Sequence, residues 1–162
     1  MSAGAGSAAI PDGVRTDATV LGFDVGTRRI GVAVGNPLVG TARAVGMVAV
    51  HPGGPDWAEV DRLARQWRPD GLIVGDPLTL DGGDQPIRKA ARAFAQELRQ
   101  RTRLPVVMID ERSSSQEASR RFAEARAAGH SRRRDAETLD ALAAVVIIER
   151  WFAAPQDAVP LS

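Results

Sequence analysis

Hydrophobic residues form short runs in the first third of the chain, and their spacing predicts strands. Apolar runs at 20–25 and 30–35 flank the turn sequence GTRR, and a third run follows at 44–50. Short runs rich in β-branched residues and separated by a glycine-containing turn are typical of antiparallel hairpins. The domain is therefore expected to begin with a three-stranded meander.

The rest of the pattern predicts helices that alternate with two further strands. Residues 56–67 place apolar side chains at helical spacing before Pro69, whereas 71–75 and 106–110 are continuous apolar runs typical of covered strands. Further helices are expected at 86–101, 113–128 and 135–152. Helices between the later strands favour parallel pairing, so the sequence predicts a three-layer α/β domain with a mixed sheet.

Composition changes at both ends of the chain. Residues 1–17 are rich in Gly, Ala and Ser and are expected to form a disordered leader, while 153–162 contain two prolines and are expected to form a flexible tail. The 162 residues suit one domain, placed at 18–152. No apolar run approaches the roughly 18 residues that span a bilayer, which predicts a cytoplasmic protein without membrane contact.

Cysteine is absent and only two histidines are present, which excludes disulfides, thiolate catalysis and cysteine-bound zinc. Any metal ion is therefore expected to have oxygen ligands. The net charge is only +1, but residues 112–134 carry seven arginines against two glutamates, a local excess of 7 − 2 = +5. This excess makes the segment a candidate phosphate-binding region, the alternative being a solvated loop, and its longest run of arginines, at its end, is Arg132, Arg133 and Arg134.

Asp24 is the only acid in the first predicted strand. Alternation in LGFDVG places Leu21, Phe23 and Val25 on one face of the sheet and Asp24 on the other. A carboxylate between apolar neighbours in a sheet is costly unless another group pairs with it. Asp24 is thus a candidate functional acid, or it caps the GTRR turn at the end of the strand.

A second acidic pair, Asp110 and Glu111, ends the strand predicted at 106–110. Ligands of open α/β sheets bind at the carboxyl ends of strands, so this pair is also a candidate. Alternation sends the two side chains to opposite faces, and at most one of them shares a site with Asp24. The alternative is that the pair is ordinary surface charge.

Asp140 is the acid that the physical argument selects most clearly, because it is the only polar residue in LDALAAVVII. A helix this apolar is expected to be buried, and the helix dipole contributes only about 0.3–1 kcal/mol to a carboxylate near its start. A divalent ion would offset the burial. If the fold brings Asp24, Glu111 and Asp140 together, they form an oxygen-lined site for Mg²⁺ or Mn²⁺ that suits two-metal phosphodiester hydrolysis.

Four segments, FDVGTRRIGVAVGN, LIVGDPLTLDG, DERSSSQEA and DALAAVVIIE, together resemble the bacterial YqgF/RuvX family of proposed Holliday-junction resolvases, also linked to maturation of the 5′ end of pre-16S ribosomal RNA. The resemblance covers about residues 19–152. It implies a ribonuclease-H-like fold and a metal-dependent endonuclease that acts on four-way DNA junctions, precursor rRNA or both. By this resemblance, Asp24, Glu111 and Asp140 occupy the positions of the acidic triad of the family. Arginines in the same motifs that are candidates for phosphate contacts are Arg28, Arg29 and Arg112.

Two positions depart from the usual motifs of the family. The family's VGLP is VGDP here, which places Asp76 at the end of the strand expected beside that of Asp24. Asp76 is therefore a candidate fourth metal ligand, or a solvated loop residue. The DER motif continues with three serines rather than the usual threonine, which keeps hydroxyl groups for helix capping but leaves the role of that position open.

Other function classes share parts of this pattern. DVGT followed by a hairpin occurs in the actin/Hsp70/sugar-kinase ATPases, but these need a second such domain and a glycine-rich adenosine site. A catalytically silent RNA-binding module stays open, as does the choice between DNA junctions and rRNA, since phosphate and metal contacts are common to both. Symmetric cutting of a junction requires a homodimer, whereas trimming of a single strand does not.

Overall fold

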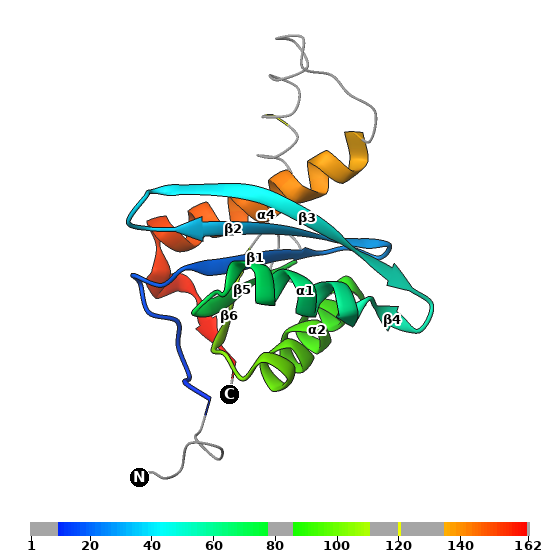
Figure 1. Cartoon of the computed structure of the whole chain (residues 1–162), viewed down its shortest axis with the longest axis horizontal. Helices are drawn as coiled ribbons and strands as arrows, with labels where there is room; N and C mark the ends of the chain where they lie inside the picture. Colours follow the sequence, from blue (N-terminus) through cyan, green and yellow to red (C-terminus); the bar gives the residue numbers. More distant parts are fainter. Residues whose placement is uncertain (1–9, 78–85, 111–119, 121–134, 162) are drawn as a thin grey trace.

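A computed structural model describes residues 10–77, 86–110, 120 and 135–161 of the chain, with side chains in the last segment described from Ala141 onward. Helices cover both faces of one mixed sheet (Figure 1). The strands are β1 Val20–Val25, β2 Arg29–Asn36, β3 Thr41–His51, β4 Gly54–Pro55, β5 Gly71–Asp76, β6 Val106–Asp110 and β7 Val159–Pro160. The helices are α1 Trp57–Trp67, α2 Pro86–Thr102 and α4 Asp135–Ala153, followed by the 3₁₀ turn η2 Pro155–Asp157.

The strand order across the described part of the sheet is β4-β3-β2-β1-β5-β6-β7. Strands β1, β2 and β3 pair antiparallel as consecutive neighbours, which confirms the predicted meander. The pairs β1–β5 and β5–β6 are parallel, as expected for strands joined through helices. Strand β1 is therefore central, and the carboxyl ends of β1, β5 and β6 meet at one edge of the sheet.

Side-chain alternation divides the apolar core into two layers. On one face Leu21 and Phe23 of β1 pack with residues of α1 and α2, including Leu63 and Phe94. On the other face Val20, Ala33 and Ile73 pack against α4. Helix α4 crosses behind the meander on the face opposite α1 and α2 (Figure 1). The predicted α/β domain with a covered mixed sheet is confirmed.

Local signals fix helix α1 as the sequence predicted. The carboxylate of Asp56 caps the helix by accepting a hydrogen bond of 3.4 Å from the Glu59 N–H. Arg68 adopts a left-handed conformation with φ of 46°, and Pro69 follows it, so the helix ends there. Within the helix, the side-chain hydrogen bond from Arg62 lowers the pKa of Glu59.

Some residues of the segments expected to be flexible, 1–17 and 153–162, make contacts with the sheet in the described part of the chain. Val14 is buried against Gly71, where the absence of a Cβ leaves room for the valine side chain. At the other end, β7 pairs with β6, and the Leu161 N–H donates to the Val106 carbonyl at 2.9 Å. Isolated apolar residues in a Gly-, Ala- and Pro-rich segment give no periodic signal, so the sequence alone does not show that the fold supplies partners for them.

The remaining boundaries agree closely with the predicted ones. Helix α2 ends one residue after the expected position, and α4 covers the expected range 135–152. The helix predicted at 113–128 lies outside the described residues. None of the helices in the described part of the chain is long and apolar enough to cross a membrane.

Candidate active site

Asp24 lies near the carboxyl end of the central strand and is partly buried. Its neighbours Phe23 and Val25 belong to the core layer of α1 and α2, so alternation turns Asp24 toward α4, on the face that the sequence predicted. The turn that follows is closed by the backbone, with the Gly26 N–H donating to the Arg29 carbonyl at 2.9 Å. Asp24 thus stands on a rigid strand at the end of the sheet where ligands of α/β folds bind.

Helix α4 approaches this face closely because two glycines leave space for it. A Cβ built on Gly22 would lie 2.5 Å from Cγ1 of Ile148 and 3.3 Å from the carbonyl oxygen of Ala144. A Cβ on Gly35 would lie 2.6 Å from Cγ2 of Ile148 and 3.0 Å from the ring of Phe152. Both positions require glycine at the present distance between helix and sheet.

These contacts define the register between α4 and β1. Gly35 of β2 is the direct partner of Val20 in β1, so its neighbours Ile148 and Phe152 lie at the height of residue 20 along the strand. The neighbours of Gly22, Ala144 and Ile148, lie at the height of residue 22. Two residues along a strand rise about 6.6 Å and four residues along a helix about 6 Å, so a step of this size on β1 is close to one helical turn of α4. Helix α4 and strand β1 run in opposite directions (Figure 1).

Asp76 lies on the opposite face of the sheet from Asp24. Leu72 and Val74 of the same strand belong to the core layer of α1 and α2, so Asp76 faces α2 as well. There its carboxylate accepts two hydrogen bonds from Arg88 of α2, from Nε at 2.8 Å and from Nη2 at 3.2 Å. The Asp76 side chain is 13% exposed and that of Arg88 is 18% exposed, so Asp76 is not a solvated loop residue, and its side chain lies on the face opposite Asp24.

Asp110 shares the face of Asp76. The two residues are direct partners in the parallel pair of β5 and β6, and Met108 of the same strand packs in the layer of α1 and α2. The backbone carbonyl of Asp110 accepts a hydrogen bond of 3.0 Å from Nη1 of Arg150 on α4. Of the acidic pair that the sequence singled out, Asp110 is thus directed away from Asp24.

The structure describes only part of the predicted site. Residue 140 lies in the second turn of α4, but its side chain, like all of Glu111, is outside the described set. Among the described side chains, no group of three histidine or acidic residues is placed to hold a metal ion. Asp24 is therefore the one member of the predicted triad whose setting is directly visible.

The candidate phosphate-binding arginines are also described in part. Arg28 is exposed at the tip of the β1–β2 hairpin, and its carbonyl accepts a hydrogen bond of 2.9 Å from the Val50 N–H. No ion pair involves its guanidinium among the residues that the structure describes. Arg29 is partly buried and does have a partner. The other candidates, Arg112, Arg132, Arg133 and Arg134, lie outside the described residues.

Sequence reasoning missed Arg88 and the cavity that it lines. This cavity of 340 Å³ lies beside β5, β6 and β7 and includes the Asp76–Arg88 ion pair. It missed a second cavity too, between the hairpin tips and α2. Neither has a local sequence signal, because residues from several distant segments line each cavity.

Comparison with known proteins gives one consistent family. A family model described as RuvX, Holliday junction resolvase, matches residues 18–154. A protein of Xanthomonas axonopodis pv. citri named "Putative pre-16S rRNA nuclease" is 66% identical over 148 residues, which cover 91% of this chain and 96% of the relative. A protein of the same name from Xanthomonas oryzae pv. oryzae is 64% identical over 154 residues, covering 95% and 96% of the two chains.

Among solved structures, RuvC of T. thermophilus in complex with a Holliday junction substrate matches with a TM-score of 0.51. The match covers 88% of this chain and 99% of that chain at 20% identity. At this identity the likeness concerns the fold, and it confirms the ribonuclease-H-like architecture expected from the sequence.

Proposed function

Because the chain belongs to the RuvX Holliday junction resolvase family, we propose that it is a metal-dependent nuclease that cleaves structured nucleic acid at a site built around Asp24. The observation that carries this proposal is the position of Asp24. Its carboxylate stands on the α4 face of the central strand, at the carboxyl end of the sheet. The names of the curated relatives support a nuclease.

The register of α4 supports Asp140 as the second acid. Residue 22 of β1 is level with residues 144 and 148 of the helix, and two strand residues correspond to four helix residues. Extending this register by one step brings residues 140 and 144 level with Asp24. This placement on the helix supports Asp140 as the partner of Asp24.

Strand alternation supports Glu111 as the third acid. Asp110 shares the face of Met108, the face of α2, so the next position in an extended chain belongs to the face of Asp24. Carboxylates from the ends of two parallel strands and from a helix crossing them form an oxygen donor set that suits Mg²⁺ or Mn²⁺. We propose that Asp24, Glu111 and Asp140 hold such ions.

When bound, these ions lower the pKa of the attacking water and stabilise the leaving oxygen. The protein contributes rigid placement of the carboxylates, through β1 and through the glycine-mediated contact of α4 with the sheet. Exposed Arg28 and the arginines of 112–134 contact the phosphates on either side of the cut. Asp76 belongs to the opposite face, where it binds Arg88.

The substrate proposed is the 5′-extended precursor of 16S rRNA, because the curated relatives carry that name, and the four-way DNA junction is the second candidate from the family description. Trimming of one strand needs a single active site, whereas symmetric resolution of a junction needs a homodimer. Light scattering in the presence of each substrate shows which assembly is present when cleavage occurs.

The test compares the two labelled substrates under identical salt and Mg²⁺ or Mn²⁺ concentrations, with the parent protein and two variants. Asp24→Asn should abolish cleavage while preserving the fold. The matched control Asp110→Asn changes an acid at the end of a neighbouring parallel strand on the other face, and it should cleave like the parent. Cleavage by Asp24→Asn at the parental rate would contradict the proposed site around Asp24. Binding without any metal-dependent cleavage by the parent would support the silent RNA-binding alternative.

A further inference from the structure

A cavity of 390 Å³ opens at the tip of the sheet on the face of α1 and α2, across β1 from the face of Asp24. Its floor is apolar, formed by Val25, Ile30 and Phe94, and prolines of the β3–β4 hairpin form one side. Strand β3 bends around the end of the sheet toward the two helices and so brings this hairpin next to them (Figure 1). The volume falls within the roughly 300–1,000 Å³ typical of small-molecule sites.

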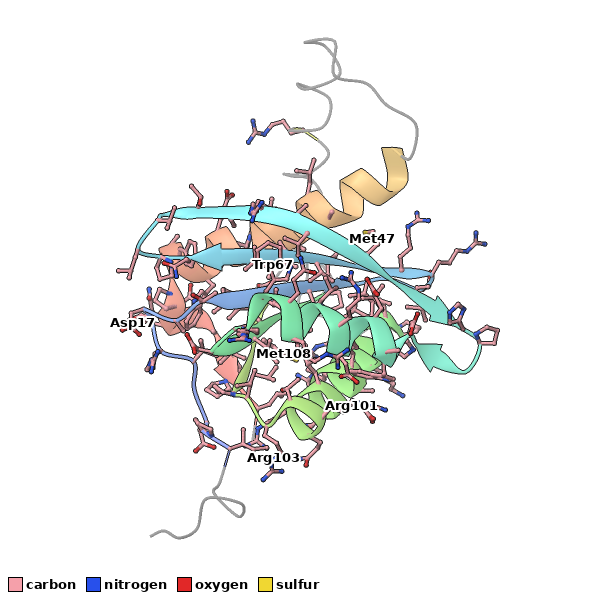
Figure 2. The ribbon with its side chains drawn as sticks, in the orientation of Figure 1. Asp17, Met47, Trp67, Arg101, Arg103 and Met108 are labelled. Atoms are coloured by element: carbon pink, nitrogen blue, oxygen red, sulfur yellow. The ribbon has the colours of Figure 1, made fainter. Side chains whose placement is uncertain are left out.

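The wall on the helical side is rigid. Trp57 stacks on Phe94 with ring centroids 5.1 Å apart and an interplanar angle of 15°. Arg101, a residue of α2 (Figure 2), places its guanidinium over the Trp57 ring, 4.6 Å from the ring centroid. These contacts fix the position of the Trp57 indole in the cavity wall.

A cation lies at the rim of this cavity. Gly26 and Val50 both line it, and Arg28 lies next to them, since its carbonyl accepts the hydrogen bond from the Val50 N–H at 2.9 Å. The Arg28 guanidinium is exposed, with no ion pair among the described residues. A largely apolar cavity with a guanidinium group nearby matches a nucleotide, which has one aromatic ring and one phosphate.

We propose that this cavity binds one unpaired base of the nucleic acid substrate, while Arg28 contacts the adjacent phosphate. The inference rests on the proposed nuclease function and specifies its substrate. A base inside a duplex cannot leave the stack without the loss of pairing, so a strand with unpaired nucleotides is preferred. A single-stranded extension next to the cut provides such a base.

Polar groups at the cavity allow it to distinguish bases. Glu97 lines the cavity, and one of its carboxylate oxygens already accepts from Nε of Arg101 at 2.8 Å. The other oxygen can accept from an exocyclic amino group, which adenine, cytosine and guanine carry and uracil lacks. The preferred base is therefore one with an amino group.

The experiment measures the affinity of an oligoribonucleotide from the 5′ extension, scanned with a single abasic site at each position, for the full chain with Asp24→Asn to prevent cleavage. One abasic position should weaken binding by roughly 5- to 100-fold. Ala93→Leu fills the cavity from an exposed position of α2 without the loss of a contact. It should weaken binding of the intact strand similarly and remove the abasic effect. Ala90→Leu, which also lines the cavity, serves as a second filling variant.

Matched controls separate the base from the phosphate. Gln100→Leu adds a leucine on the same helix outside the cavity and should bind like the parent. Arg28→Ala should weaken intact and abasic strands equally and flatten the slope of log K against log[salt] by about 1, whereas exposed Arg65→Ala should not.

The outcomes distinguish the two proposals. If the strand binds and the parent cleaves it, but no abasic position matters or the effect persists in both filling variants, the base-binding inference is wrong and the nuclease proposal stands. If the strand does not bind at all, the base-binding inference is wrong, and the nuclease proposal then depends on cleavage of the four-way junction. If the parent cleaves neither substrate, the nuclease proposal is wrong.

Discussion

The close contact between α4 and β1 predicts that Gly22→Ala damages stability and catalysis together. The new Cβ would lie 2.5 Å from Cγ1 of Ile148, whereas ordinary contacts are 3.4–4 Å, so the helix must retreat by about 1 Å. Ile148 is fully buried and cannot rotate into solvent. Overpacking of this kind costs about 1–3 kcal/mol, and the lower entropy of the unfolded alanine chain offsets about 0.4–1 kcal/mol.

The expected net loss is therefore about 1–2 kcal/mol, measured by urea denaturation, with Tm lower by roughly 3–8 °C. Cleavage should fall further than stability explains, because a displacement of about 1 Å between catalytic groups can cost about 100-fold in rate. The assay therefore measures metal-dependent cleavage at a temperature at which the variant is fully folded.

Gly46→Ala is the matched control within the same sheet. A Cβ there would meet Leu63 at 3.6 Å, an ordinary contact, so this variant should be neutral or slightly more stable and should cleave normally. A double-mutant cycle with Ile148→Ala adds a second check, since the new methyl group enters the space that the shortened side chain leaves. A Gly22→Ala variant as stable and active as Gly46→Ala, or an additive cycle, would refute the argued register of α4.

Three further predictions concern the charged groups. Asp76→Leu should cost about 1–3 kcal/mol because it removes the carboxylate that accepts two hydrogen bonds from Arg88 in a partly buried position. Asp76→Leu combined with Arg88→Leu should recover part of this loss in urea denaturation, and neither variant should alter the metal dependence of cleavage. Alanine at positions 132, 133 and 134 should weaken binding similarly for different sequences and lower the salt slope by up to about 2–3, and an unchanged slope would mean a solvated loop. Mg²⁺ or Mn²⁺ should raise the Tm of the parent, because the ion binds only the folded state. Asp140→Asn should abolish cleavage and leave the metal-free protein at least as stable as the parent. If this variant cleaves at the parental rate or unfolds at a lower temperature without metal, Asp140 is a structural acid.

The sequence predicted the fold well where one periodic pattern dominates. Strands β1 and β2, helix α1 and the runs that form β5 and β6 each have a clear period and a recognisable end, such as Pro69 after α1. Alternation also predicted the face of Asp24 correctly, because β1 is regular and buried on both sides. Local rules were sufficient for these elements.

Other features depend on partners that are distant in the sequence. The burial of Val14 depends on the space above Gly71, and β7 exists because β6 offers an open edge to residues near the end of the chain. The ion pair of Asp76 joins a strand end to the third residue of α2. No periodicity in one segment can show such contacts, so composition indicated flexible ends and left Asp76 among the candidate ligands.

The ends of β1, β5 and β6 show why proximity in a sheet does not decide which acids share a site. Asp24, Asp76 and Asp110 all stand at the same carboxyl edge, and a count of acids there would suggest one cluster. The pleat separates them, because Asp76 and Asp110 face α2 and Asp24 faces α4. On the α2 side Arg88 compensates the charge of Asp76 through two hydrogen bonds, so no metal ion is needed there. We therefore propose the ion on the α4 face, where Asp24 stands and where the extended register of α4 predicts Asp140.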